Sequence, residues 1–290
     1  MRDSIHGVYT ALVTPFREDG VDFAALEQLI EHQIEAGIHG LVPCGTTGES
    51  ATLTVAEHDV VVKFTVDTVA GRVPVLAGAG SNSTIEAVAR TRHAAEVGAD
   101  ATLHIMPYYN KPGQKGMVRH VEAVAEVGVP IVLYNIPSRT GVSLTMESYR
   151  HLAQIDEVIA TKEATGDLAM AESLLAEGRL RVLSGDDGLT FPLVCLGGHG
   201  VVSVTSNVAP AAMVELYERA AAGDVAGARE SHFKLLPLMK ALFLECNPGP
   251  AKAALALQGR CEEILRLPLT SVSPETRQCL ESVLSDLSPA

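Results

Sequence analysis

The chain has 290 residues, 47% of them hydrophobic, which is long enough to bury a sizeable core in one large domain or two smaller ones. Lys and Arg total 22 against 35 Asp and Glu, and the resulting net charge of -13 argues against nucleic acid or an anionic membrane surface as a partner. Five scattered cysteines without C-x-x-C spacing, no signal-peptide core in MRDSIHGVYT and no run of about 18 apolar residues together predict a soluble cytoplasmic protein without a disulfide framework or membrane span.

Short β-branched runs alternate with amphipathic stretches along most of the chain. In chain order the predicted strands are VYTALVTPF, HGLVPCG, VPVLAGAG, ATLHIMP, PIVLYNIP, VIATKEAT, LRVLSGDD and GVVSVTSN. Alternation of strands with helices indicates a parallel sheet, and eight such units within about 220 residues predict a (β/α)₈ TIM barrel. The alternative is an open doubly wound sheet, but its G-x-G-x-x-G turn is missing, since the first turn is VTPFREDG.

Helix signals support the same alternation. The residues from Leu26 to Ile34 present one apolar face, and Gly37 follows as a helix stop. Capping boxes, with a Glu three residues later, predict that helices begin after Thr54 and Ser83. We assign residues 1–224 to the barrel and predict that 225–290 form a helical extension packed on it, because no low-complexity linker separates the two parts.

The barrel architecture predicts where chemistry is located, because active sites of such barrels gather at the carboxyl ends of the strands. Polar or reactive side chains are concentrated at these positions. They are found in GTTGES, PYYNKPGQ, YNIPSRTG, the strand that contains Lys162, and SGDD.

Lys162 is unusual because it lies inside a predicted buried strand, where Ala160 and Ala164 share its face. Burial can lower the pKa of a lysine by roughly 3 to 5 units from about 10.4. A neutral amine attacks carbonyls, so one interpretation is a Schiff-base lysine that converts a keto substrate into an iminium and then an enamine. The alternative is an ion pair with a carboxylate of a neighbouring strand.

Hydroxyl and guanidinium groups lie at neighbouring strand ends. Tyr134 ends the adjacent strand, where its phenol either fills the barrel end or shuttles a proton during imine formation. Thr46 and Thr47 lie in a tight loop that is either an ordinary connection or a site for a small carboxylate. Arg139 is either solvated or a bidentate clamp for a second carboxylate.

The order and separation of seven segments resemble those of a known family. The segments are GTTGES, PYYNKP, YNIPSRTG, KEATGD, SGDD, GVVSVTSNVAP and NPGPAK. From about residue 5 to 270 the chain is similar to the dihydrodipicolinate synthases, also called 4-hydroxy-tetrahydrodipicolinate synthases. These belong to the pyruvate-dependent class I aldolases and lyases, which are (β/α)₈ barrels with a Schiff-base lysine.

The resemblance implies that Lys162 forms an imine with pyruvate, whose enamine attacks the aldehyde of L-aspartate 4-semialdehyde on the way to lysine and diaminopimelate. It implies no cofactor beyond this covalent imine. The residues matched to family roles are Tyr134, Thr47 and Tyr109 for the proton relay, Thr46 and Thr47 for the pyruvate carboxylate, Arg139 for the semialdehyde carboxylate, and the backbone carbonyls of Gly185 and Val202. The matching tyrosine of the family, here Tyr109, enters the neighbouring subunit's site, so a homotetramer built as a dimer of dimers is implied.

Departures from the family pattern concern regulation. The positions that match its lysine-binding feedback site are Ser50, Ala51, Val55, His58, Asn82, Glu86 and Tyr108. Val55 replaces the histidine of lysine-sensitive relatives, and an isopropyl group cannot form a hydrogen bond, so we expect inhibition by lysine to be weak or absent. Met106 and Gly249 also replace the usual threonine and isoleucine, and we assign no effect to them.

Other functions are compatible with parts of this pattern. N-acetylneuraminate lyases, which the chain resembles more distantly, have serine in place of Thr46 and lack the arginine at Arg139, so both residues favour the synthase. Another pyruvate-dependent aldolase with a different aldehyde, and a barrel that only binds a keto acid, remain alternatives. Metal-dependent barrels begin with H-x-H where this chain has TALVTPF, and His104 stands alone in a strand, so no metal is predicted.

Overall fold

The computed structural model describes residues 5–287, and its main sheet closes into a parallel barrel. The strand order is β4-β1-β10-β9-β8-β7-β6-β5, and a parallel bridge between Leu41 and Val75 joins the two edges. The strands are β1 (Gly7–Ala11), β4 (Gly40–Val42), β5 (Leu76–Gly78), β6 (Ala101–Ile105), β7 (Ile131–Asn135), β8 (Val158–Glu163), β9 (Arg181–Ser184) and β10 (Gly200–Ser203). Each lies within a predicted run or begins one residue before it, and the predicted (β/α)₈ barrel is confirmed.

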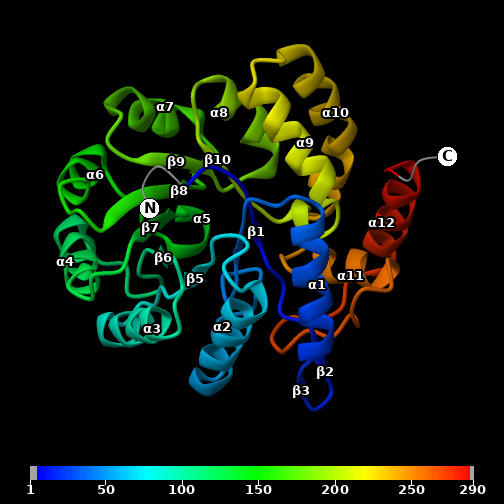
Figure 1. The fold of residues 1–290 in the computed structure, drawn as a ribbon, viewed down its shortest axis with the longest axis horizontal. Coiled ribbons are helices and arrows are strands. Elements are labelled where there is room, and N and C mark those ends of the chain that lie inside the picture. The colour runs from blue at the N-terminus through cyan, green and yellow to red at the C-terminus, as the bar shows by residue number, and fades with distance from the viewer. Residues whose placement is uncertain (1–4, 288–290) are drawn as a thin grey trace.

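Helices surround the strands in the predicted alternating order (Figure 1). The outer helices are α1 (Phe23–Glu35), α2 (Val55–Val69), α3 (Thr84–Glu96), α4 (Gln114–Ala125), α6 (Met146–Leu152), α7 (Leu168–Glu177), α8 (Thr190–Cys195) and α9 (Pro210–Ala221). Shorter elements occupy the loops: the hairpin of β2 (Phe16–Arg17) and β3 (Gly20–Val21), helix α5 (Pro137–Thr140), and the 3-10 helices η2 (Asp187–Leu189) and η3 (Thr205–Asn207). Across residues 5–287, no helix combines the length and apolar character that crossing a bilayer requires.

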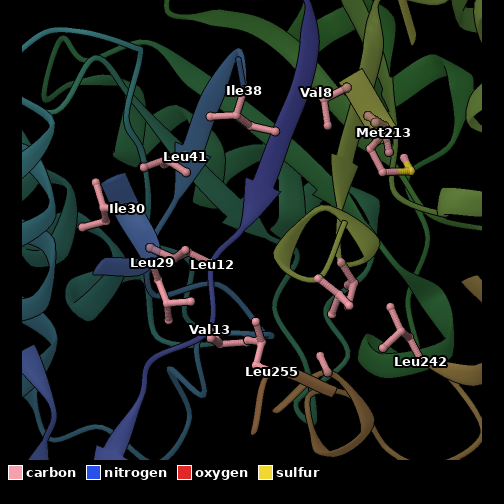
Figure 2. Close-up of a cluster of buried hydrophobic side chains, with 14 of the residues drawn as sticks. Val8, Leu12, Val13, Leu29, Ile30, Ile38, Leu41, Met213, Leu242 and Leu255 are labelled. Carbon is pink, nitrogen blue, oxygen red and sulfur yellow. The ribbon is translucent and has the colours of Figure 1, made fainter. Parts of the chain in front are cut away.

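The C-terminal segment packs on the barrel as three further helices. They are α10 (Val225–Ala241), α11 (Gly249–Leu257) and α12 (Pro274–Leu287). Helix α10 lies against α9, and α12 contacts both α10 and α11. Figure 2 shows Leu242 and Leu255 of this segment in one buried cluster with Val8, Leu12 and Val13 of the barrel. Because the two parts share a core, the segment is held in a fixed place beside the carboxyl end of β1.

The two predicted capping boxes have different outcomes. The first is confirmed, because Thr54 Oγ1 accepts a hydrogen bond from the Glu57 backbone N–H and the Glu57 carboxylate accepts one from the Thr54 N–H. At the second position a helix does begin directly after Ser83, as predicted, but the capping box itself is wrong, because Ser83 makes no side-chain cap. The Glu86 carboxylate that would complete this box accepts instead from the Ser81 hydroxyl and from Arg90.

Glu57 also ties the C-terminal segment to α2, because both of its carboxylate oxygens accept hydrogen bonds from the Arg266 guanidinium. These bonds are the main reason that the pKa of Glu57 falls to about 2 from an ordinary 4.5. A carboxyl group whose pKa is lower in the folded than in the unfolded state stabilises the fold above pH 4.5, and this stabilisation is lost as the pH falls toward 2.

We therefore expect Glu57→Gln to lower the free energy of unfolding by about 1–2 kcal/mol at pH 7, a value reduced for the partial exposure of this pair. The difference from wild type should narrow at pH 3, where the wild-type carboxylate is itself partly protonated. Denaturant unfolding at the two pH values measures both quantities. A difference of the same size at pH 3 would show that lost side-chain packing, and not charge, accounts for the effect.

Candidate active site

A cavity of about 680 Å³ opens at the carboxyl ends of the barrel strands. Its wall includes Gly45 and Thr46 after β4, Gly78 and Gly80 at and after β5, Leu103 and Ile105 of β6, Tyr134 of β7, and Arg139 of α5. The C-terminal segment closes one side with Cys246, Asn247, Pro268 and Leu269. The cavity is located where barrels of this architecture perform their chemistry.

Lys162 lies in β8 with its side chain in the barrel interior, and the residue is only 6% exposed. It pairs in register with Tyr134 of β7, and its Nζ lies 4.2 Å from the centre of the Tyr134 ring. Space for the side chain depends on Gly185, where an added Cβ would lie 3.1 Å from the Lys162 Cε and 2.5 Å from the Ala164 Cβ. The small residues predicted around this lysine therefore leave room for it. Tyr134, which Lys162 contacts, lines the cavity, so the lysine lies next to the cavity wall.

The carboxylate next to Lys162 in sequence, that of Glu163, has other partners. Glu163 faces away from the barrel interior and accepts hydrogen bonds from Asn135 Nδ2 at 3.1 Å and from the Tyr149 hydroxyl at 3.3 Å. Within residues 5–287, no acidic oxygen lies within ion-pair distance of Lys162 Nζ. The ion pair considered for Lys162 from the sequence is thus not what the structure shows.

The loop after β4 holds its two threonines differently. Thr46 lines the cavity, whereas Thr47 is 2% exposed and its Oγ1 accepts a hydrogen bond from Asn247 Nδ2 at 3.0 Å. The loop contains Glu49 in a left-handed conformation with φ of 53°, a conformation that a non-glycine residue seldom adopts without support.

A buried ion pair supplies that support. Glu49 Oε1 lies 2.5 Å from Lys252 Nζ, and both side chains are fully excluded from solvent. Lys252 also donates to the Ile264 carbonyl at 2.8 Å, and its ammonium lies 4.0 Å from the centre of the Phe16 ring. Burial lowers the pKa of Lys252, while the adjacent carboxylate opposes that shift. The C-terminal segment therefore anchors the threonine loop through this pair.

The remaining predicted catalytic and substrate-binding residues have distinct positions. Arg139 lines the cavity and its Nη2 donates to the Asn247 carbonyl at 3.5 Å. Val202 is buried in β10 among the residues of the barrel interior. Tyr109 is 90% exposed and lies outside the cavity of its own chain, with its backbone at φ 70°. Gly185, as described above, lies against Lys162.

Most positions matched to the feedback site border the same cavity. Ser50, Ala51, Val55, Glu86 and Tyr108 line it, so the cavity extends outward from Tyr134 to α2 and α3. His58 is buried, with Nε2 2.8 Å from the Gly78 carbonyl, and burial lowers its pKa. The backbone carbonyl of Asn82 accepts a hydrogen bond from Asn110 Nδ2 at 2.9 Å.

Histidine and acidic side chains do not assemble a metal site in the described residues, where no three His, Cys, Asp or Glu groups are placed to hold an ion. His104 is buried in β6, with Nε2 3.1 Å from the Thr102 hydroxyl, and burial lowers its pKa to about 3. Its environment is that of a neutral core histidine.

Several residues of the site were not assigned a role from the sequence. They are Arg90, Asn247 and Lys252. NPGPAK, the segment that contains Asn247 and Lys252, contributed to the family resemblance, but its position in a helical extension gave no reason to place it at the mouth of the barrel. Contacts between residues about 200 positions apart decide that placement.

These features define a (β/α)₈-barrel enzyme with a cavity at the carboxyl ends of its strands and a buried lysine that has no acidic partner within residues 5–287. Residues 4–287 match the model of the dihydrodipicolinate synthetase family, and the chain belongs to that family.

Individual relatives match over nearly their whole length. The 4-hydroxy-tetrahydrodipicolinate synthase of Syntrophus aciditrophicus is 51% identical over 283 residues, which cover 97% of each chain. A crystal structure of dihydrodipicolinate synthase from Aquifex aeolicus is 46% identical, with a TM-score of 0.95 and 97% of each chain covered. The dihydrodipicolinate synthase of Acinetobacter baumannii, in a crystal structure complexed with pyruvate, is 42% identical with a TM-score of 0.96, covering 98% of this chain and 99% of its own.

Proposed function

We propose that this protein condenses pyruvate with L-aspartate 4-semialdehyde to form 4-hydroxy-tetrahydrodipicolinate, a step toward lysine and meso-diaminopimelate. It is a lyase of the synthase type that its relatives represent. The observation that supports this function most directly is Lys162, a buried amine that has no acidic partner in residues 5–287 and lies against Tyr134 at the wall of the cavity. A pyruvate complex of a 42% identical relative supports the choice of keto acid.

The proposed reaction begins when the Lys162 amine attacks the pyruvate ketone and the resulting carbinolamine loses water to form an imine. Tyr134, Thr47 and Tyr109 of the partner subunit move the protons that this dehydration requires. The protonated imine draws electrons from the methyl carbon, which loses a proton to give an enamine. The enamine carbon forms the new bond to the aldehyde, and the substrate amine then displaces Lys162 as the ring closes. The covalent imine supplies the electron sink, so no separate cofactor is required.

Substrate binding is assigned to the groups around this lysine. Thr46 and Thr47 hold the pyruvate carboxylate, and Arg139 binds the carboxylate of the semialdehyde. Gly185 and Val202 contribute backbone carbonyls near the reacting atoms. Thr46 and Arg139 both border the cavity, which supports their roles at opposite ends of the bound substrates.

The test of this function is turnover with pyruvate and a panel of aldehydes that includes aspartate semialdehyde. The proposed function requires the highest kcat/KM with aspartate semialdehyde. A higher value with another aldehyde would identify the protein as a related pyruvate-dependent aldolase. Binding of pyruvate without turnover of any aldehyde would identify a barrel that only binds keto acids.

We further propose that the active form is a cytoplasmic homotetramer built as a dimer of dimers. Tyr109 supports an assembly in which neighbouring subunits complete each other's sites, because its 90% exposed side chain lies outside its own cavity. Val55 and Ile85 are also large apolar side chains exposed to solvent in the single chain. Sedimentation velocity at assay concentrations measures the assembly, and an active monomer would contradict a role for the partner's tyrosine.

L-lysine is expected to inhibit this protein weakly or not at all. The Val55 side chain lines the cavity at the matched regulatory position but offers no hydrogen-bonding group to an amino acid. The measurement is a titration of the turnover rate with L-lysine at fixed pyruvate, with Val55→His as the matched variant that restores a ring nitrogen. Half-inhibition of the wild type below the millimolar range would refute this expectation.

A further inference from the structure

Asn247 connects the C-terminal segment to both carboxylate-binding groups of the proposed site. It is 5% exposed and lines the cavity. Its Nδ2 donates to Thr47 Oγ1 at 3.0 Å, and its backbone carbonyl accepts from Arg139 Nη2 at 3.5 Å. We propose that Asn247 is a positioning residue that orients the Thr47 hydroxyl as a hydrogen-bond donor to the bound keto acid. This inference rests on the proposed function and assigns a role to a residue outside the matched catalytic set.

The direction of the hydrogen bond between the two side chains carries this inference. A threonine hydroxyl has one proton and two lone pairs. Because one lone pair of Thr47 Oγ1 accepts the amide proton of Asn247, the hydroxyl's own proton points elsewhere. No acceptor in residues 5–287 receives that proton from Thr47, although the residue is almost fully buried. The neighbours of Thr47, Thr46 in sequence and Asn247 through the hydrogen bond, both line the cavity. A carboxylate bound there is the acceptor that we infer for this proton, and hydrogen bonds to ionised acceptors are the stronger kind.

A second observation concerns the other end of the Asn247 amide. Its Oδ1 is buried and has no hydrogen-bond donor within the described part of the chain. Buried acceptors without a donor are uncommon in folded proteins and call for a specific explanation. The amide of Asn247 is therefore held on one side only within the described residues, by its bond to Thr47.

Pyruvate-dependent trapping of Lys162 by borohydride tests this role without the aldehyde substrate. The measured quantity is the pyruvate concentration that gives half-maximal labelling, in wild type, Asn247→Ala, Thr47→Val and the double variant. Asn247→Ala is expected to raise it by about 5- to 20-fold, with labelling at saturating pyruvate retained. In the Thr47→Val background, the same replacement should have little further effect, because Asn247 acts through the threonine.

Two further variants separate positioning from structure. Gln258→Ala removes an amide that donates to the Val208 carbonyl at 3.1 Å elsewhere in the C-terminal segment, and it should leave the half-maximal concentration unchanged. Asn247→Asp keeps the shape but replaces the donor by an acceptor, which captures the Thr47 proton, so it should weaken binding at least as much as Asn247→Ala. Thermal unfolding of each variant verifies that it is folded.

The outcomes distinguish this inference from the proposed function. Equal half-maximal concentrations in wild type and Asn247→Ala, additive effects in the double variant, or wild-type behaviour of Asn247→Asp would each overturn the positioning role while the function stands. Absence of any pyruvate adduct on wild-type Lys162 would overturn the proposed function and this inference with it.

Discussion

Replacing Lys162 by alanine is expected to abolish the covalent adduct that forms with pyruvate and borohydride and to lower turnover by at least about 10³-fold. The reason is chemical, since Lys162 is the buried amine that lies against Tyr134, a residue of the cavity wall, and no lysine of residues 5–287 lines the cavity itself. Intact mass followed by peptide mapping measures the adduct and its position. Labelling of wild type at Lys162 and no labelling of Lys162→Ala is the expected result.

Two controls make this result specific. Lys252 is also buried, but its ammonium is held by Glu49, so its peptide should remain unlabelled in the same samples. Tyr134→Phe retains the lysine and the aromatic ring but lacks the hydroxyl, so the adduct should form more slowly and reach the same mass. An adduct that maps to any other lysine, or that persists in Lys162→Ala, would rule out the proposed mechanism.

The free energy of unfolding of a Lys162 variant tests the catalytic role of this lysine independently of the adduct. Since no carboxylate of the described chain, residues 5–287, pairs with the Lys162 side chain, Lys162→Met leaves no buried acidic group behind. We therefore expect a free energy of unfolding within about 1 kcal/mol of wild type, in a folded but inactive protein. A loss of activity without a loss of stability is typical of a residue retained for chemistry.

Local sequence patterns predicted the barrel well because its elements depend on nearby residues. The apolar face from Leu26 to Ile34 and the stop at Gly37 correspond to α1, and the strand containing Lys162 corresponds to β8. The helix after Ser83 was predicted correctly, but its capping box failed for a reason that is not visible in the capping pattern. The Glu86 carboxylate is bound by Ser81 and Arg90 instead. The spacing of Ser83 and Glu86, on which the prediction was based, does not reveal these competing partners.

The site was predicted only in part because much of its wall comes from distant segments. Alternation with alanines marked Lys162 as exceptional within its strand. Lys252 lies in AKAALAL, where one lysine in an apolar helix is ordinary, and its partner Glu49 is about 200 residues away. Asn247 is likewise joined to Thr47 across 200 positions. One sequence does not disclose such pairings, because they depend on how the extension packs against the barrel.

For Lys252, which is paired with Glu49, we expect a large loss of stability on replacement, the opposite of what we expect for Lys162. Lys252→Met removes one partner and leaves a carboxylate fully excluded from solvent, so the free energy of unfolding should fall by about 3 to 5 kcal/mol. Lys63→Met is the matched control, because its partner Asp67 is 58% exposed and the loss should be at most about 1 kcal/mol. Denaturant unfolding at equal protein concentration measures both, and equal losses in the two variants would contradict a structural role for the buried pair.

A compensating replacement shows whether the uncompensated charge causes the loss. Glu49→Gln introduced together with Lys252→Met removes the charge but keeps an oxygen that can accept from the Arg266 N–H, which donates to Glu49 Oε2 at 3.1 Å in the wild type. The double variant should therefore be more stable than Lys252→Met alone. Glu49 is also joined to the threonine loop, because its backbone N–H donates to the Thr46 carbonyl at 3.1 Å. If Lys252→Met disorders this loop, the variant should also need a higher pyruvate concentration for half-maximal labelling of Lys162. Recovery of stability without recovery of pyruvate binding would show that the ion pair, beyond holding the fold, sets the geometry of the threonine loop.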